Sequence, residues 1–166
     1  MDIFEFAMTK EKQAEQNYRH LAEKADQAGL KNILTMLADE ETRHYRTVER
    51  MRSQTPGDVG ETSILANAKE IFEKMKASAE RFDFHVSEAE LYRKARDIEE
   101  QSKKFYLEKA DEVEDPAQKK IFKKLAEEED RHVVLMEALT NFVSRPQTYL
   151  EDAEFYHFDD YVDGNF

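Results

Sequence analysis

The sequence predicts an all-α protein, a four-helix bundle built from two repeated helical hairpins. Its 166 residues include only four glycines and three prolines, and the stretches between them are rich in Ala, Leu, Glu and Lys, which favour helices. Apolar residues recur in these stretches every three or four positions, the period of a helix with one buried face. In addition, residues 7–51 align without a gap with residues 95–139, as expected for a duplicated structural unit.

The pattern predicts four long helices, over 3–27, 30–52, 88–114 and 117–144. Asp2 and Ser87 each precede a Glu by three positions, the spacing of a capping box at a helix start. Asp115 directly precedes Pro116, which places an N-cap residue before a proline at the first helical position.

The lengths of the connections predict how these helices are joined. The first and third connections are short, so each pair of helices is expected to form an antiparallel hairpin. The middle connection carries an additional short helix, expected over 63–81, and crosses from one hairpin to the other. We expect two regions: a bundle over 1–145, and an irregular acidic, aromatic tail over 146–166 that packs on the bundle or on a second subunit.

Composition and charge exclude several classes of function. A net charge of −12 argues against nucleic acid or an anionic membrane as partner. The chain has no cysteine, which excludes disulfides, iron–sulfur clusters and thiol catalysis. Its longest apolar runs are too short to span a membrane, and its first residues lack the pattern of a signal peptide. We therefore expect a cytoplasmic protein.

The internal repeat preserves residues that carry chemistry. Fourteen of the 45 aligned positions are identical. Unrelated acidic helices share scattered Glu and Ala, but the repeat also pairs two tyrosines and two histidines in one register. The identical pairs include Glu11/Glu99, Tyr18/Tyr106, Glu41/Glu129 and His44/His132.

Each predicted helix has a glutamate near the middle of its apolar stripe: Glu11, Glu41, Glu99 and Glu129. His44 and His132 follow two of them by three positions, which places both side chains on one helix face. A buried carboxylate without a partner costs several kcal/mol, and no inward Lys or Arg is placed to neutralise four of them. Two divalent cations would do so. A single Glu-x-x-His is usually a solvated surface pair, but its duplication on the buried face predicts a two-metal site.

On these residues, the chain resembles the rubrerythrin branch of the ferritin-like di-iron carboxylate proteins over 3–144. The resemblance is carried by the segments 41–44 and 129–132 and by Glu11 and Glu99, each followed by the Tyr and Ala of the repeat. It implies that Glu41 and Glu129 bridge two metal ions, with Glu11, Glu99 and the two histidines as terminal ligands. Which histidine lies with which terminal glutamate stays open.

Two departures from the family pattern matter. Rubrerythrins carry a further glutamate one turn after the position of Glu99, where this chain has Ser102, so a redox-linked ligand exchange is in doubt. They also carry a four-cysteine iron domain that supplies electrons. Because this chain has no cysteine, it would need electrons from a separate donor protein.

Other residues near the motifs have weaker assignments. Tyr18 and Tyr106 are candidate catalytic residues whose hydroxyls would hydrogen-bond ligand carboxylates and supply a proton; alternatively, both simply pack in the core. Glu40 and Glu128 would hold the imidazole N–H groups, or belong to a solvated acidic face. Arg43 and Arg131 would pair with those acids, or lie on the surface.

The favoured function is a non-haem di-iron oxidoreductase that reduces hydrogen peroxide or dioxygen. Its cofactor would be two iron ions, with manganese or zinc as possible substitutes. The alternatives are ferritin-like iron oxidation and storage, or a non-enzymatic dimetal-binding bundle. Expected partners are a second copy of the chain, in a homodimer with or without exchange of helix pairs, and an external electron-donor protein.

Overall fold

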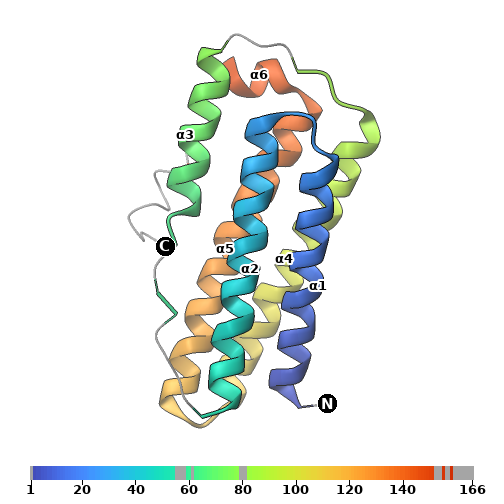
Figure 1. Ribbon diagram of the computed structural model, residues 1–166. Coiled ribbons are helices and arrows are strands. Elements are labelled where there is room, and N and C mark those ends of the chain that lie inside the picture. Colours follow the sequence, from blue (N-terminus) through green and yellow to red (C-terminus); the bar gives the residue numbers. More distant parts are fainter. Residues whose placement is uncertain are drawn as a thin grey trace. The chain divides into compact units, whose positions relative to one another are not determined.

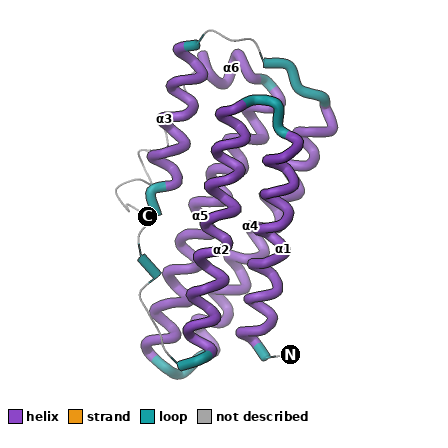
Figure 2. The backbone as a smooth tube through the Cα atoms, viewed as in Figure 1, coloured by secondary structure: helices purple, strands orange, loops and turns teal. Residues whose placement is uncertain are grey.

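The computed structural model describes residues 2–54, 59–60, 62–78, 82–151, 155 and 158. This part of the chain contains helices and no strand, so the predicted all-α class is confirmed (Figures 1 and 2). None of its helices is long and apolar enough to cross a membrane. The helices are α1 (Ile3–Lys24), α2 (Ala28–Arg52), α3 (Ile64–Ala77), α4 (Val86–Glu112), α5 (Pro116–Ser144) and α6 (Pro146–Glu151).

Side-chain caps fix the starts of α1 and α5. The backbone N–H of Glu5 donates to Asp2 Oδ1 over 2.8 Å, and that of Ala117 donates to Asp115 Oδ1 over 2.9 Å. These bonds satisfy N–H groups that have no partner within the helix. Both predicted caps are confirmed.

The predicted cap at Ser87 is wrong, because α4 begins at Val86. The Glu88 carboxylate accepts from the backbone N–H of His85 over 3.4 Å, and the Ser87 hydroxyl lies 2.7 Å from His85 Nδ1. Glu88 thus reaches back to the chain ahead of the helix, as the glutamate of a capping box does. Ser87 is already inside the helix.

The chain divides into two compact units. Unit 1 comprises 1–61 and 104–126, and unit 2 comprises 62–103 and 127–166. In unit 1, α1 and α2 pack together as the expected antiparallel hairpin (Figure 1). Parts of α4 and α5 join them, since all four helices contribute to one buried cluster. Its helical members are Ala7, Val48, Met51, Tyr106, Ala110, Ile121, Phe122, Leu125 and Ala126.

A polar contact ties the two helices of each hairpin together at equivalent positions of the repeat. In unit 1, Thr42 of α2 donates its hydroxyl to Glu15 of α1, a carboxylate only 8% exposed. In unit 2, the equivalent residues are Lys103 and Asp130, whose charged atoms lie 2.8 Å apart. The duplication therefore keeps the place of this contact, although its chemistry has changed.

Unit 2 contains an aromatic cluster centred on Phe72 of α3. The rings of Phe142, Tyr149, Phe155 and Phe158 lie 5.3 to 6.3 Å from the Phe72 ring, measured between centroids. Phe155 is fully buried. Aromatic pairs at such separations stabilise a core beyond the area that they bury.

The segment after the fourth long helix begins with a helix, α6, where the sequence predicted irregular structure. Pro146 starts α6, consistent with the preference of proline for the first helical position. Residues 152–154, 156–157 and 159–166 of the predicted tail lie outside the described residues. The packing of the tail as a whole, and the boundary at 145, therefore stay predictions.

Acid is expected to weaken unit 1 through Glu15. Hydrogen bonds from Thr42 and Lys12 outweigh burial and, with Arg19, lower the pKa of Glu15 from 4.5 to about 2. Because the folded-state pKa is the lower one, the ionised carboxylate stabilises the fold above the unfolded-state pKa. That contribution is lost as the pH falls from 4.5 toward 2.

Glu15→Gln should therefore lower stability at neutral pH and flatten its dependence on acidic pH. Urea denaturation at a series of pH values from about 5 to about 2.5 measures this. Glu23→Gln, at an exposed position of the same helix, is the control and should follow the wild type. A Glu15→Gln variant with the wild-type pH dependence would contradict the assignment.

Candidate metal centre

All six side chains predicted as metal ligands are buried. Glutamates of this kind are almost never fully buried unless they are paired, so the interior must compensate for these charges. Their exposed fractions are Glu11 3%, Glu41 1%, His44 0%, Glu99 2%, Glu129 0% and His132 0%.

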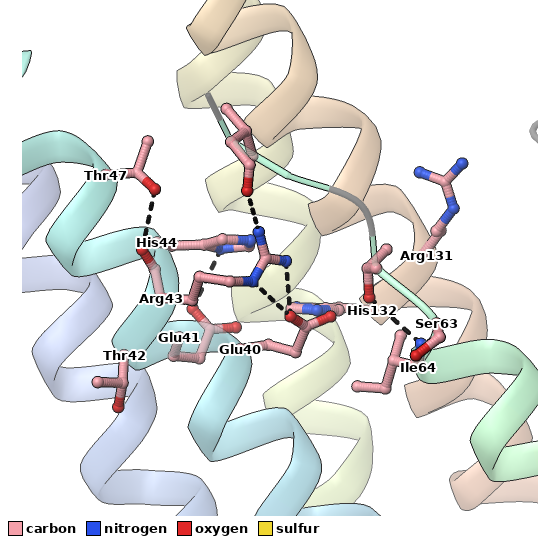
Figure 3. A network of polar contacts seen from close by, with 12 residues as sticks. Glu40, Glu41, Thr42, Arg43, His44, Thr47, Ser63, Ile64, Arg131 and His132 are labelled. Atoms are coloured by element: carbon pink, nitrogen blue, oxygen red, sulfur yellow. Dashed lines mark hydrogen bonds and ion pairs between the residues drawn. The ribbon is translucent and has the colours of Figure 1, made fainter. Parts of the chain in front are cut away.

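Three of these residues form one group in unit 1. Glu11 comes from α1, while Glu41 and His44 lie one turn apart on α2 (Figure 3). His44 Nδ1 is 3.7 Å from Glu11 Oε2 and 4.0 Å from Glu41 Oε2. One potential ligand atom from each side chain lies within 4.8 Å of the other two.

The other three form an equivalent group in unit 2. Glu99 lies on α4, and Glu129 and His132 lie on α5. His132 Nδ1 is 3.6 Å from Glu99 Oε2 and 3.6 Å from Glu129 Oε2. Each histidine thus lies beside the glutamate of its own hairpin. That the two residues share a metal ion stays a prediction.

A tyrosine hydroxyl holds one of the buried carboxylates. Tyr106 of α4 donates its hydroxyl to Glu11 Oε1 over 2.6 Å, in a buried environment. The bond joins a residue of the second repeat to a glutamate of the first. Tyr18 is equally buried, at 2% exposure.

The electrostatics of Glu11 favour its ionised form. Burial raises the pKa of Glu11, but its contacts with Glu41, His44 and Tyr106 together lower it by more. Its Oε2 atom is buried and accepts no hydrogen bond within the described part of the chain. This negative oxygen therefore faces the His44 imidazole at a separation longer than a hydrogen bond.

The donor set of unit 1 fits a divalent metal ion. Carboxylate and imidazole ligands bind such an ion at about 2.0–2.2 Å, which places neighbouring ligand atoms roughly 3–4 Å apart. The distances of 3.7 and 4.0 Å from His44 to the two carboxylates are close to that range. A cation here would satisfy Glu11 Oε2, a buried atom that otherwise lacks a partner in the described chain.

Arg43, beside the ligand motif of α2, pairs with Glu40. Its Nη2 and Nε atoms lie 2.6 and 3.0 Å from Glu40 Oε2 (Figure 3), and Nη1 donates to the backbone carbonyl of Val59. Arg43 therefore fastens the segment after α2 to the ligand helix. Its counterpart Arg131 donates to the backbone carbonyl of Glu127 over 3.4 Å. Glu128 is buried, at 4% exposure.

A helical bundle with buried Glu-x-x-His motifs defines a carboxylate-type metal-binding protein of the ferritin-like class. A comparison with family models agrees: the model described as Rubrerythrin matches residues 2–140. The chain therefore belongs to the rubrerythrin family. Neither the comparison with curated proteins nor that with solved structures gave a match.

Tyr106→Phe tests the buried hydrogen bond directly. The variant keeps the ring but removes the donor to Glu11, and a hydrogen bond to a charged group contributes about 1.5–3 kcal/mol. We expect a loss of that size in the unfolding free energy of the metal-free protein at neutral pH, measured by chemical denaturation.

Tyr92→Phe is the matched control for this variant. The Tyr92 ring is also buried, at 3% exposure, but its hydroxyl is not bonded to Glu11. It should lose clearly less stability than Tyr106→Phe. Equal losses in the two variants would show that the bond to Glu11 contributes no more to the unfolding free energy than an ordinary buried tyrosine hydroxyl does.

Proposed function

We propose that this protein is a rubrerythrin-like di-iron oxidoreductase that reduces hydrogen peroxide or dioxygen with electrons from a separate donor protein. The observation that carries the proposal is the occurrence of the same buried Glu, Glu and His group in each unit, at one repeat offset. Membership of the rubrerythrin family supports it.

The proposed ligands are the six residues of the two groups. Glu41 and Glu129, the glutamates of the two Glu-x-x-His motifs, would bridge the metal ions, as the family pattern implies. Glu11 and Glu99 would be terminal ligands, each beside the histidine of its own hairpin, His44 and His132. We propose that both groups serve one dinuclear centre, which the duplicated sequence and membership of the family support.

Two ferrous ions, when bound, supply the two electrons that reduce one hydrogen peroxide, with two protons, to two water molecules. The chain's own contribution is to position the carboxylates and to exclude water. The Tyr106 hydroxyl oxygen lies 2.6 Å from Glu11 Oε1, to which it donates a hydrogen bond. We propose that Tyr106 orients this ligand and supplies a proton to the reaction. Tyr18 would play the corresponding part in the other half of the repeat.

Electrons must come from outside the chain in this proposal. The sequence contains no cysteine, and therefore no site for the four-cysteine iron domain of the family pattern. A homodimer in the cytoplasm, served by a separate donor protein, is the setting that we propose for this activity.

Metal content and peroxide reactivity test the proposal together. Protein purified without added metal, and then loaded anaerobically with ferrous ion, should hold about two irons per chain. Titration with hydrogen peroxide should reach its end point at one peroxide for every two ferrous ions. His44→Ala should lose one metal position, whereas His20→Ala, at an exposed position of α1, should keep both.

The possible failures point to different errors. Two iron ions that react with neither peroxide nor dioxygen would contradict the enzyme but leave a dimetal-binding bundle. Uptake of many irons per chain in the presence of dioxygen would favour storage. Failure of the protein to bind metal, or a His44→Ala variant that keeps both metal positions, would show that the ligand set is wrong.

A further inference from the structure

Two aromatic rings meet at the surface of unit 1, and each lies under a lysine. The rings of Phe6 on α1 and Phe105 on α4 have centroids 5.1 Å apart, and Phe6 is 40% exposed. Lys10 Nζ lies 5.5 Å from the centre of the Phe6 ring, and Lys109 Nζ lies 5.6 Å from that of Phe105. Lys109 also pairs with Glu112. Phe6, Lys10, Phe105 and Lys109 are called the docking surface below.

The docking surface is connected to the candidate metal centre through one residue. The Phe105 ring contacts that of Tyr106 edge to face, at a centroid separation of 5.4 Å. The Tyr106 hydroxyl then bonds Glu11 over 2.6 Å. Ring contacts and one hydrogen bond therefore lead from an exposed ring to a proposed metal ligand without a gap. Because electron tunnelling weakens steeply across gaps, such a path favours electron transfer.

The internal repeat does not account for the docking surface. The positions equivalent to Phe6, Lys10, Phe105 and Lys109 are Lys94, Ile98, Asn17 and Leu21. Tyr18, the counterpart of Tyr106, therefore has the exposed Asn17 as its neighbour where Tyr106 has a phenylalanine. The equivalent positions of the other half lack these rings and lysines, so the repeat does not explain them.

We propose that the docking surface receives a small acidic one-electron donor protein, and that Tyr106 couples the Phe105 ring to Glu11. The inference deepens the proposed function, which requires external electrons. Each encounter passes one electron and oxidises one donor molecule. Two encounters therefore reduce two ferric ions to the ferrous state, and no bond is made or broken.

Charge argues for an acidic donor. The chain carries a net charge of −12, which repels an acidic protein from most of its surface. Screening limits that repulsion to about 8 Å at physiological salt, so local charges decide where such a protein can approach. Lys10 supplies local positive charge beside an apolar contact, and Lys109 adds a second ammonium group whose charge Glu112 partly offsets. A cation beside an apolar contact steers a partner and fixes its orientation.

Binding of an oxidised, acidic [2Fe–2S] ferredoxin to the zinc-loaded protein tests the surface without turnover. Titration calorimetry at physiological ionic strength, where the overall repulsion is screened, should show that the double variant Lys10→Glu, Lys109→Glu binds about tenfold more weakly than the wild type. The control is the double variant Lys31→Glu, Lys120→Glu, which makes the same change in net charge at two exposed positions elsewhere. It should bind nearly as well as the wild type.

Stopped-flow reduction of the iron-loaded protein tests the path. Phe105→Leu should slow reduction by the reduced ferredoxin about tenfold, because it removes the ring between the surface and Tyr106. Reduction by dithionite, a small molecule that needs no docking surface, should be unchanged. Phe84→Leu is the control for loss of a ring, because the Phe84 ring contacts Phe142 in unit 2 at a centroid separation of 5.5 Å. It should match the wild type with both reductants.

Each result has one meaning. Equal weakening of binding by the two double variants, or a wild type that dithionite reduces and ferredoxin does not, would overturn the docking proposal. Both of these results are compatible with oxidation of the ferrous protein by peroxide. In that case the docking proposal would fail and the proposed function would stand. Conversely, site-specific ferredoxin binding in a protein that is inert to peroxide would support the surface and contradict the reductase.

Discussion

The burial of carboxylate side chains inside a helical bundle is the constraint on which this structure depends. Glu11 shows how it is met: one oxygen accepts the Tyr106 hydroxyl, and the other faces His44 at 3.7 Å. Burial alone would neutralise this group by raising its pKa, but its polar neighbours lower the pKa instead. The contacts around Glu11 therefore favour its ionised form. A buried charge without compensation costs several kcal/mol. A bound cation would supply that compensation.

The internal repeat places a buried Glu, Glu and His group in each unit, while the residues around the two groups differ. The histidine-to-glutamate distances of 3.7 and 3.6 Å are nearly the same in both units. Outside the ligand groups, the copies differ. The contact between Glu15 and Thr42 has become a lysine–aspartate pair. A side chain that must hold a metal is restricted in position and chemistry, whereas its neighbours are free to take up other roles, such as the proposed reception of electrons.

Local signals made most of the fold predictable, and tertiary contacts account for what was missed. Helix periodicity and the caps at Asp2 and Asp115 act within a few residues. The error at Ser87 arose because Glu88, one residue further on, reaches back to His85. The sequence indicated the six ligand candidates, because each is a polar residue on the apolar stripe of a predicted helix. Glu15 lies beside that stripe, and its burial depends on partners such as Thr42. The bond between Tyr106 and Glu11 joins residues 95 positions apart, which no local pattern can indicate.

Anomalous X-ray diffraction at the iron edge, from crystals of the iron-loaded protein, tests most directly whether the buried acids form a metal centre. The account predicts two anomalous peaks per chain, one bonded by Glu11 and His44 and the other by Glu99 and His132. Ligand distances should be about 2.0–2.3 Å. Peaks confined to exposed acidic residues, or one peak that contacts neither histidine, would contradict it.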